Sequence, residues 1–78
     1  MEPIDVIFRV DDQGKIYPLE FFWKERRYKI TSTGRRWEEE ATLHILVMIA
    51  DEQVFELVYS QNESCWHLKE KDTSQKLL

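Results

Sequence analysis

The fold is decided by the stretch LHILVMIADEQVFELVY, which spans residues 43–59. Apolar side chains occupy nearly every position of its first half, so a strand over this half has two largely apolar faces. Residues 50–53, Ala-Asp-Glu-Gln, interrupt the run, and the apolar pattern resumes from Val54 to Tyr59. We therefore predict a central hairpin that consists of a strand buried on both sides, a tight polar turn and a return strand.

Shorter segments on both sides of this hairpin alternate between apolar and polar residues with the period of a strand. They cover residues 4–10, 19–24, 27–33 and 64–69. Leu19, Phe21 and Trp23 are expected to share one face of their strand, and Trp66 and Leu68 are expected to point inward. Pro18 has no N–H and is expected at a strand edge, a bulge or a strand start. We predict an all-β fold of about six antiparallel strands in a meander, which forms a small half-open barrel or two packed sheets.

Residues 35–42, RRWEEEAT, are the one stretch with helix-favouring composition. Glu and Ala favour a helix, but eight residues are too few for a stable isolated one. We predict a loop or at most one short helical turn, which lays Trp37 over an edge of the core.

Length and composition limit the class of protein. The chain has 78 residues, which indicates a single β domain over residues 1–71 and a frayed tail over residues 72–78. The single cysteine, Cys65, excludes an intramolecular disulfide, and the chain shows no charged and apolar leader, so we expect a cytoplasmic protein. Its longest apolar run has about eight residues, far fewer than the roughly 20 of a membrane-spanning helix.

Charge is unevenly distributed along the chain. Residues 24–36 contain six basic residues and one acidic residue, which gives +5 and leaves −9 on the rest of a chain of net charge −4. This stretch predicts an interaction surface that consists of Arg26, Arg27, Lys29, Arg35, Arg36 and Trp37. We expect a non-catalytic protein-interaction or accessory module that binds an unknown partner or a second copy of itself. The alternative is a nucleic-acid-binding module, because Lys and Arg neutralise phosphates while aromatic side chains stack on bases.

Other candidate sites are weaker. Glu38, Glu39 and Glu40 are consecutive, so their carboxylates do not converge from several segments on one cation. Cys65, His67 and His44 provide three zinc ligands, whereas a structural zinc site needs four. We therefore predict no catalytic residues, no metal, no cofactor and no small-molecule ligand. The three Trp residues are assigned to the core.

The aromatic residues also form a recurring pattern. It begins with FxWxxxxYxI over residues 21–30, continues with Trp37, Leu57 and Tyr59, and ends with WxL over residues 66–68. This pattern resembles a family of small bacterial β-rich domains of unknown function, some of which are encoded near or attached to Y-family DNA polymerases. The resemblance covers about residues 4–71 and departs from the family pattern in the acidic run within residues 35–42. It implies a β-rich fold, no assigned catalytic residues and a role near nucleic acid.

Overall fold

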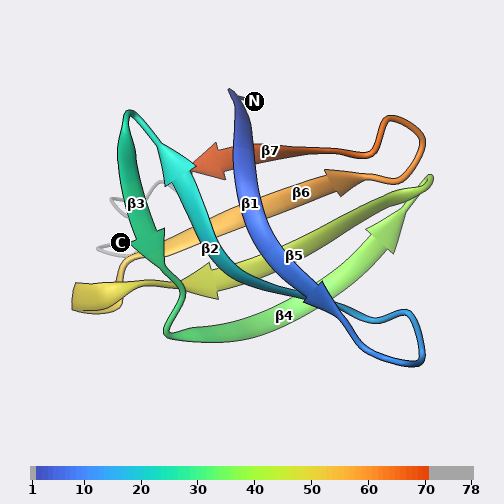
Figure 1. Cartoon of the computed structure of the whole chain (residues 1–78), viewed down its shortest axis with the longest axis horizontal. Helices are drawn as coiled ribbons and strands as arrows, with labels where there is room; N and C mark the ends of the chain where they lie inside the picture. Colours follow the sequence, from blue (N-terminus) through green and yellow to red (C-terminus); the bar gives the residue numbers. More distant parts are fainter. Residues whose placement is uncertain (1, 71–78) are drawn as a thin grey trace, which may run out of the picture.

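The computed structural model describes residues 2–70, which form antiparallel strands and one short 3-10 turn (Figure 1). Within this range there are seven strands and no α-helix. The elements are β1 (Glu2–Val10), β2 (Ile16–Trp23), β3 (Arg26–Lys29), β4 (Ser32–Glu39), β5 (Thr42–Met48), η1 (Ala50–Glu52), β6 (Val54–Ser60) and β7 (Cys65–Glu70). The all-β prediction is confirmed, with seven strands in place of about six.

The predicted central hairpin is confirmed as β5 and β6, which pair antiparallel from Thr42–Ser60 to Met48–Val54 around the η1 turn. Its first strand is buried unequally on its two faces. Leu43, Ile45 and Val47 are buried, whereas His44, Leu46 and Met48 are half-buried. The strand is therefore apolar on both sides, as expected, but only one side belongs to the closed core.

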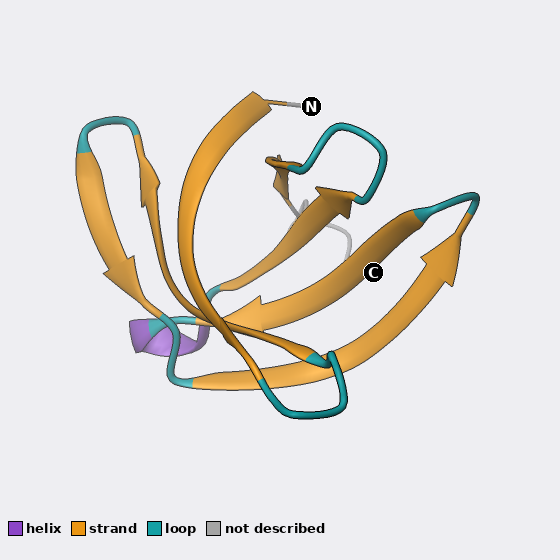
Figure 2. Ribbon diagram, turned by 45° about the vertical axis from the view of Figure 1, so that its right-hand side comes forward, coloured by secondary structure: helices purple, strands orange, loops and turns teal. Residues whose placement is uncertain are grey.

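The strands curl around one interior as a half-open barrel, which was one of the two predicted forms (Figure 2). Their order is β3-β2-β1-β7-β6-β5-β4, so β3 and β4 form the two edges of the sheet. These edges are consecutive in the chain. The Ile30 N–H donates to the Leu19 carbonyl and the Thr31 N–H donates to the Met48 carbonyl, so the chain crosses from β2 to β5 within two residues. The barrel is thus closed near Ile30 and open between the start of β2 and the end of β4.

The main error of the sequence analysis concerns residues 35–42. Most of this stretch belongs to β4, which pairs with β5 from Ser32–Met48 to Glu39–Thr42 and contains neither a helical turn nor a long loop. Residues Glu40 and Ala41 form the hairpin turn with φ values of 50° and 63°, the left-handed conformation that a two-residue hairpin turn requires. Pairing with an apolar strand outweighs the weak helix propensity of Glu and Ala here.

Pro18 lies at a β-bulge, one of its three predicted positions. The register of β1 and β2 shifts because Ile7 pairs with Glu20 while Phe8 pairs with Pro18, which leaves Leu19 as the extra residue. Leu19 is therefore exposed, and the prediction that it shares a face with Phe21 was wrong. Phe21 itself is fully buried.

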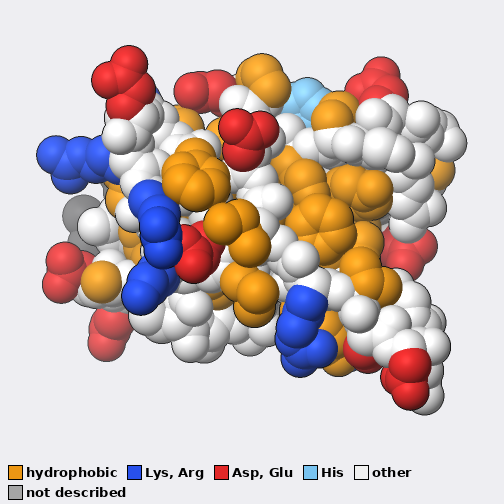
Figure 3. Space-filling model, viewed as in Figure 1, with side chains coloured by type: hydrophobic (Ala, Val, Ile, Leu, Met, Phe, Trp, Pro, Cys, Tyr) orange, Lys and Arg blue, Asp and Glu red, His pale blue; other side chains and the backbone are white. Residues whose placement is uncertain are grey.

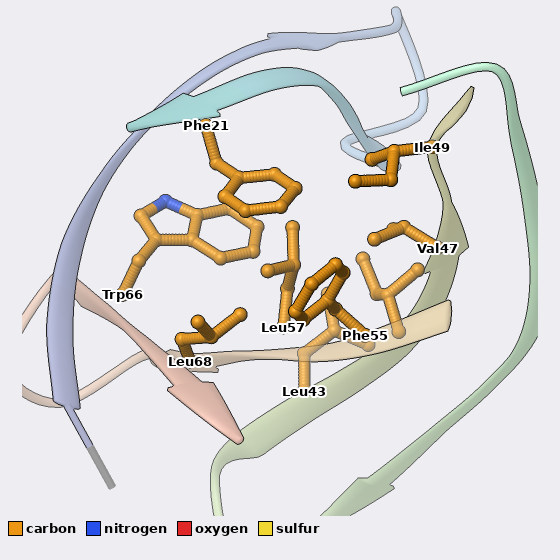
Figure 4. Packing of buried hydrophobic residues seen from close by; sticks show 9 residues of the cluster. Phe21, Leu43, Val47, Ile49, Phe55, Leu57, Trp66 and Leu68 are labelled. Carbon is orange, nitrogen blue, oxygen red and sulfur yellow. The ribbon is translucent and has the colours of Figure 1, made fainter. Parts of the chain in front are cut away.

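The core is a single cluster of buried apolar side chains that point toward one another from β2, β5, β6, β7 and the residue after β5 (Figure 4). It consists of Phe21, Leu43, Ile45, Val47, Ile49, Phe55, Leu57, Trp66 and Leu68. Trp66 and Leu68 lie inward as predicted. Trp23 and Tyr28 are half-buried and pack against this cluster, each with its ring beside that of Phe55.

Two expectations about the chain ends and membranes remain. The predicted tail, residues 72–78, lies outside the described residues. Across residues 2–70, no helix combines the length and the apolar character that crossing a bilayer demands.

Candidate interaction surface

The six predicted interface residues fall into two groups. Arg26, Arg27 and Lys29 lie on β3, and Arg35, Arg36 and Trp37 lie on β4, which runs away from β3 (Figure 1). Extended chain rises about 3.3 Å per residue, so the six steps from Lys29 to Arg35 separate the two groups by up to roughly 20 Å. The six residues do not form one compact patch. Nucleic-acid binding through all of them together stays a prediction, and their spacing would require a long ligand.

The β3 group continues a face that begins on β1 and β2. Across the three strands, Phe22 lies between Asp5 and Arg27, and Glu20 lies between Ile7 and Lys29. Residues paired in this way point to the same side of a sheet. Arg27 Nε forms an ion pair with Glu20, which fixes the guanidinium beside the neighbouring apolar side chains.

Large hydrophobic residues are exposed only on β1 and β2 within the described part of the chain, and their exposed fractions run from 36 to 54%. They are Ile7, Phe8, Val10, Leu19 and Phe22. We call Ile7, Leu19 and Phe22, together with Arg27 and Lys29, the outer face. Figure 3 shows hydrophobic side chains gathered over β1 and β2 with basic side chains beside them. The outward positions of Ile7 and Phe22 in alternating strands were the sequence signal for this surface, but the sequence analysis did not use it.

Phe8 lies on the opposite side of β1. The pairing of β1 with β7 ends at Ile4 and Trp66, and beyond this point the strands separate. The Phe8 ring lies 5.4 Å from Trp66 and 6.2 Å from Tyr59, between ring centroids, so it covers this separation. Phe8 therefore contributes to the closure of the core as well as to the surface.

Trp37 does not lie over the core edge as predicted. Its ring is stacked on His44 on the outside of β4 and β5, with centroids 5.0 Å apart and planes 5° apart. The Arg35 guanidinium lies 5.1 Å from the centroid of the Trp37 ring. His44 in turn lies 2.8 Å from Glu56, measured from Nδ1 to Oε2, and 3.6 Å from Glu39, measured from Nε2 to Oε1.

Arg36 crosses the opening of the barrel. Its guanidinium Nη2 donates to the Ile16 carbonyl at 2.8 Å, in place of a strand-to-strand hydrogen bond between β4 and β2. A cleft of about 530 Å³ lies at this opening, with Gln13, Lys15, Arg36, Glu38 and Gln61 among its lining residues. The sequence analysis missed the cleft because its walls come from segments that are distant in the chain.

The remaining candidates do not form a reactive site. Glu38 and Glu39 are successive residues of a strand and point to opposite faces. His44 on β5 is separated from Cys65 and His67 on β7 by the intervening β6. Among residues 2–70, no three His, Cys, Asp or Glu side chains are grouped so that they could hold a metal ion.

Cys65 is poorly suited to act as a nucleophile. Desolvation raises the pKa of its thiol, and the Glu63 carboxylate, which accepts a hydrogen bond from Sγ at 3.5 Å, raises this pKa further. Since the thiolate is the reactive form, these surroundings lower the reactivity of Cys65.

Comparison of the chain with protein-family models, with curated proteins and with solved structures yields no match. The resemblance to polymerase-associated β-rich domains therefore stays a prediction.

Proposed function

We propose that this domain is a non-catalytic protein-interaction module that binds its partner through the outer face. The observation that carries this proposal is the concentration of exposed large hydrophobic residues on β1 and β2. Isolated exposed apolar residues are ordinary, but a group of them on one small sheet is typical of a contact surface.

The composition of the outer face supports the proposal. Aromatic and Arg side chains are enriched at the centres of protein interfaces, and Phe22 and Arg27 are cross-strand neighbours here. Phe22 and Ile7 occupy adjacent rows of the same face, so both can contact one partner segment.

The charges of the outer face indicate the chemistry of the partner. Arg27 and Lys29 flank the apolar side chains, and two acidic residues lie on the same side: Glu20, which forms an ion pair with Arg27, and Asp5, which pairs with Phe22. A partner surface with an apolar anchor bordered by charges of both signs complements this arrangement. The single cysteine supports placing the interaction in a reducing compartment, the cytosol.

The test compares affinity capture by the wild-type protein with capture by Phe22→Ser, followed by quantitative mass spectrometry of the retained proteins. Lys15→Gln is the matched control because Lys15 is exposed but lies outside the outer face. We expect a retained protein that is shared by wild type and Lys15→Gln and reduced at least tenfold by Phe22→Ser, as for the loss of an interface anchor. Circular dichroism checks that Phe22→Ser folds.

Self-association is a second form of the same proposal and needs its own measurement. Light scattering after gel filtration, over a range of protein concentrations, distinguishes a monomer from a dimer. A dimer that Phe22→Ser dissociates identifies the partner as a second copy. A monomer at every concentration, together with capture unaffected by Phe22→Ser, would rule out the proposal.

A further inference from the structure

Three basic side chains gather around Tyr17 at the open end of the barrel. The Arg9 guanidinium carbon lies 4.3 Å from the centroid of the Tyr17 ring, Lys15 Nζ lies 5.4 Å from it, and the Arg36 guanidinium carbon lies 5.8 Å from it. They come from β1, from the segment before β2 and from β4. The fold therefore assembles this cluster from segments that are far apart in the sequence. Only Arg36 of the cluster belongs to the basic stretch of residues 24–36.

The positive charge of this cluster is only partly compensated. None of the salt bridges among the described residues involves Arg9, Lys15 or Arg36. The Asp11 carboxylate compensates part of it: Oδ1 accepts the backbone N–H groups of Gln13 and Lys15, and Oδ2 accepts the Tyr17 hydroxyl. The Lys15 N–H is the main cause that lowers the pKa of Asp11, and the charge of Arg9 lowers it further. Glu38 lines the adjacent cleft.

Arg36 is held in place before any ligand arrives. Its hydrogen bond to the Ile16 carbonyl is partly buried and fixes the guanidinium at the edge of the cleft. A preorganised cation loses less conformational entropy on binding than a mobile one. Guanidinium and ammonium groups that converge in this way favour an anion with several acceptor oxygens.

The cleft beside the cluster is large enough for an organic group. Its volume of about 530 Å³ lies within the usual range of roughly 300–1,000 Å³ for small-molecule sites. The Gln13 and Gln61 amides line it from the two sides and can both donate and accept hydrogen bonds.

We propose that the open end of the barrel binds a phosphate ester, with the phosphate between Lys15 and Arg36 and the organic group in the cleft. A phosphate ester fits better than a carboxylate because a phosphate monoester carries about −1.5 to −2 charges and three acceptor oxygens. Arg9 lies on the same side of β1 as Ile7 of the outer face, but Lys15 and Arg36 are not residues of that face, and the proposed interaction function does not depend on them.

The test is titration of the full-length ¹⁵N-labelled protein, followed by ¹H–¹⁵N NMR, with inorganic phosphate, with adenosine 5′-monophosphate and with a short single-stranded oligonucleotide. With the mononucleotide, we expect the largest shifts at the backbone amides of Gly14, Lys15 and Arg36. Lys15→Gln is expected to weaken binding about five- to tenfold, the effect of losing one charge-assisted contact. Lys24→Gln is the matched control, because it removes an exposed Lys that belongs neither to the outer face nor to the cleft lining, and it is expected to leave this binding unchanged.

The outcomes separate the sources of the phosphate. Tighter binding of the mononucleotide than of inorganic phosphate, weakened by Lys15→Gln, supports a phosphate-ester site. Equal affinities for these two probes would refute a role for the cleft. Binding of the oligonucleotide alone would overturn the small-ligand proposal in favour of a nucleic-acid surface. Shifts elsewhere, or none at millimolar concentrations, would overturn the proposal entirely, whereas the capture experiment with Phe22→Ser would be unaffected.

Discussion

His44 Nδ1 lies 2.8 Å from Glu56 Oε2, and this contact joins the outer sides of β5 and β6. Glu56 is only 3% exposed and is the one buried charged side chain among the described residues. Removal of a carboxylate from water is unfavourable unless it is paired or hydrogen-bonded. The imidazole supplies that partner, and stacking on Trp37 holds the imidazole in position.

We predict that His44→Leu lowers the free energy of unfolding by about 2–3 kcal/mol, because it leaves Glu56 buried without its partner. The double variant His44→Leu/Glu56→Leu is expected to be more stable than His44→Leu, since both polar groups are then replaced by apolar ones. Urea denaturation of the wild type and the two variants measures these differences. A double variant no more stable than His44→Leu would show that the pairing is not the source of the loss.

Two hairpin turns use residues that are unsuited to their backbone conformation. Lys24 and Glu25 have φ values of 52° and 62°, and Glu40 and Ala41 have 50° and 63°. Such turns favour Asn-Gly, because these residues adopt positive φ with little strain. We predict that replacing Glu40-Ala41 with Asn-Gly raises the free energy of unfolding by about 0.5–1 kcal/mol. Thermal and urea denaturation provide the measurement.

The control for this prediction is Glu39→Gly, one residue earlier in β4. Glu39 is in the strand and is not among the residues with positive φ, so Gly there is expected to destabilise the protein. Stabilisation by Glu39→Gly, or destabilisation by the Asn-Gly variant, would contradict the explanation from turn geometry.

The sequence predicts the strands with a continuously buried face better than it predicts the edge strand β4, its turn and the bulge in β2. Period-two alternation correctly identified β5, β6 and β7, because each has one continuously buried face. β4 was missed because it lies at a sheet edge, where most of its side chains are exposed, and because Glu40-Ala41 carries no turn signal. The prediction that Leu19 and Phe21 share a face was wrong because a bulge interrupts the alternation of side chains along β2.

The candidate sites were less predictable than the strands. The basic stretch was visible in the sequence, but the bend near Ile30 sends its two halves along different edges of the sheet. Arg9, Lys15 and Arg36 converge only because the barrel brings β1 and β2 opposite β4. Such convergence depends on register and curvature, which local patterns do not specify.

Trp66 lies at the centre of the packing, beside Phe8 and Tyr59, and is 5% exposed. We predict that Trp66→Ala lowers the free energy of unfolding by about 3–5 kcal/mol, through lost burial and the resulting cavity. Among residues 2–70, no group accepts a hydrogen bond from the buried Trp66 indole N–H, so Trp66→Phe loses volume but breaks no hydrogen bond within this range. We therefore expect Trp66→Phe to be clearly milder in urea denaturation. If Trp66→Ala and Trp66→Phe lowered the free energy of unfolding equally, the volume that Trp66 fills in the core would not be the source of its stabilising effect.

We expect the ionisation of Asp11, in the turn of the first hairpin, to make the stability of the folded protein change with pH in the acid range. The backbone N–H of Lys15 is the main cause that lowers the pKa of Asp11 from its ordinary value of 3.8, with further contributions from the Gln13 N–H, the Tyr17 hydroxyl and Arg9. A carboxyl whose pKa is lowered by folding stabilises the folded state above its unfolded pKa, and this stabilisation disappears as the pH falls through the folded pKa. Asp11→Asn keeps an oxygen acceptor but removes the charge. We therefore predict that Asp11→Asn is less stable than the wild type at neutral pH and that the difference narrows below the ordinary Asp pKa. Denaturation midpoints measured from neutral pH down through this range check the prediction.

Asp12→Asn is the control, because among the described residues no backbone N–H donates to the Asp12 carboxylate. A constant difference between Asp11→Asn and the wild type at every pH would mean that the carboxylate charge does not stabilise this turn.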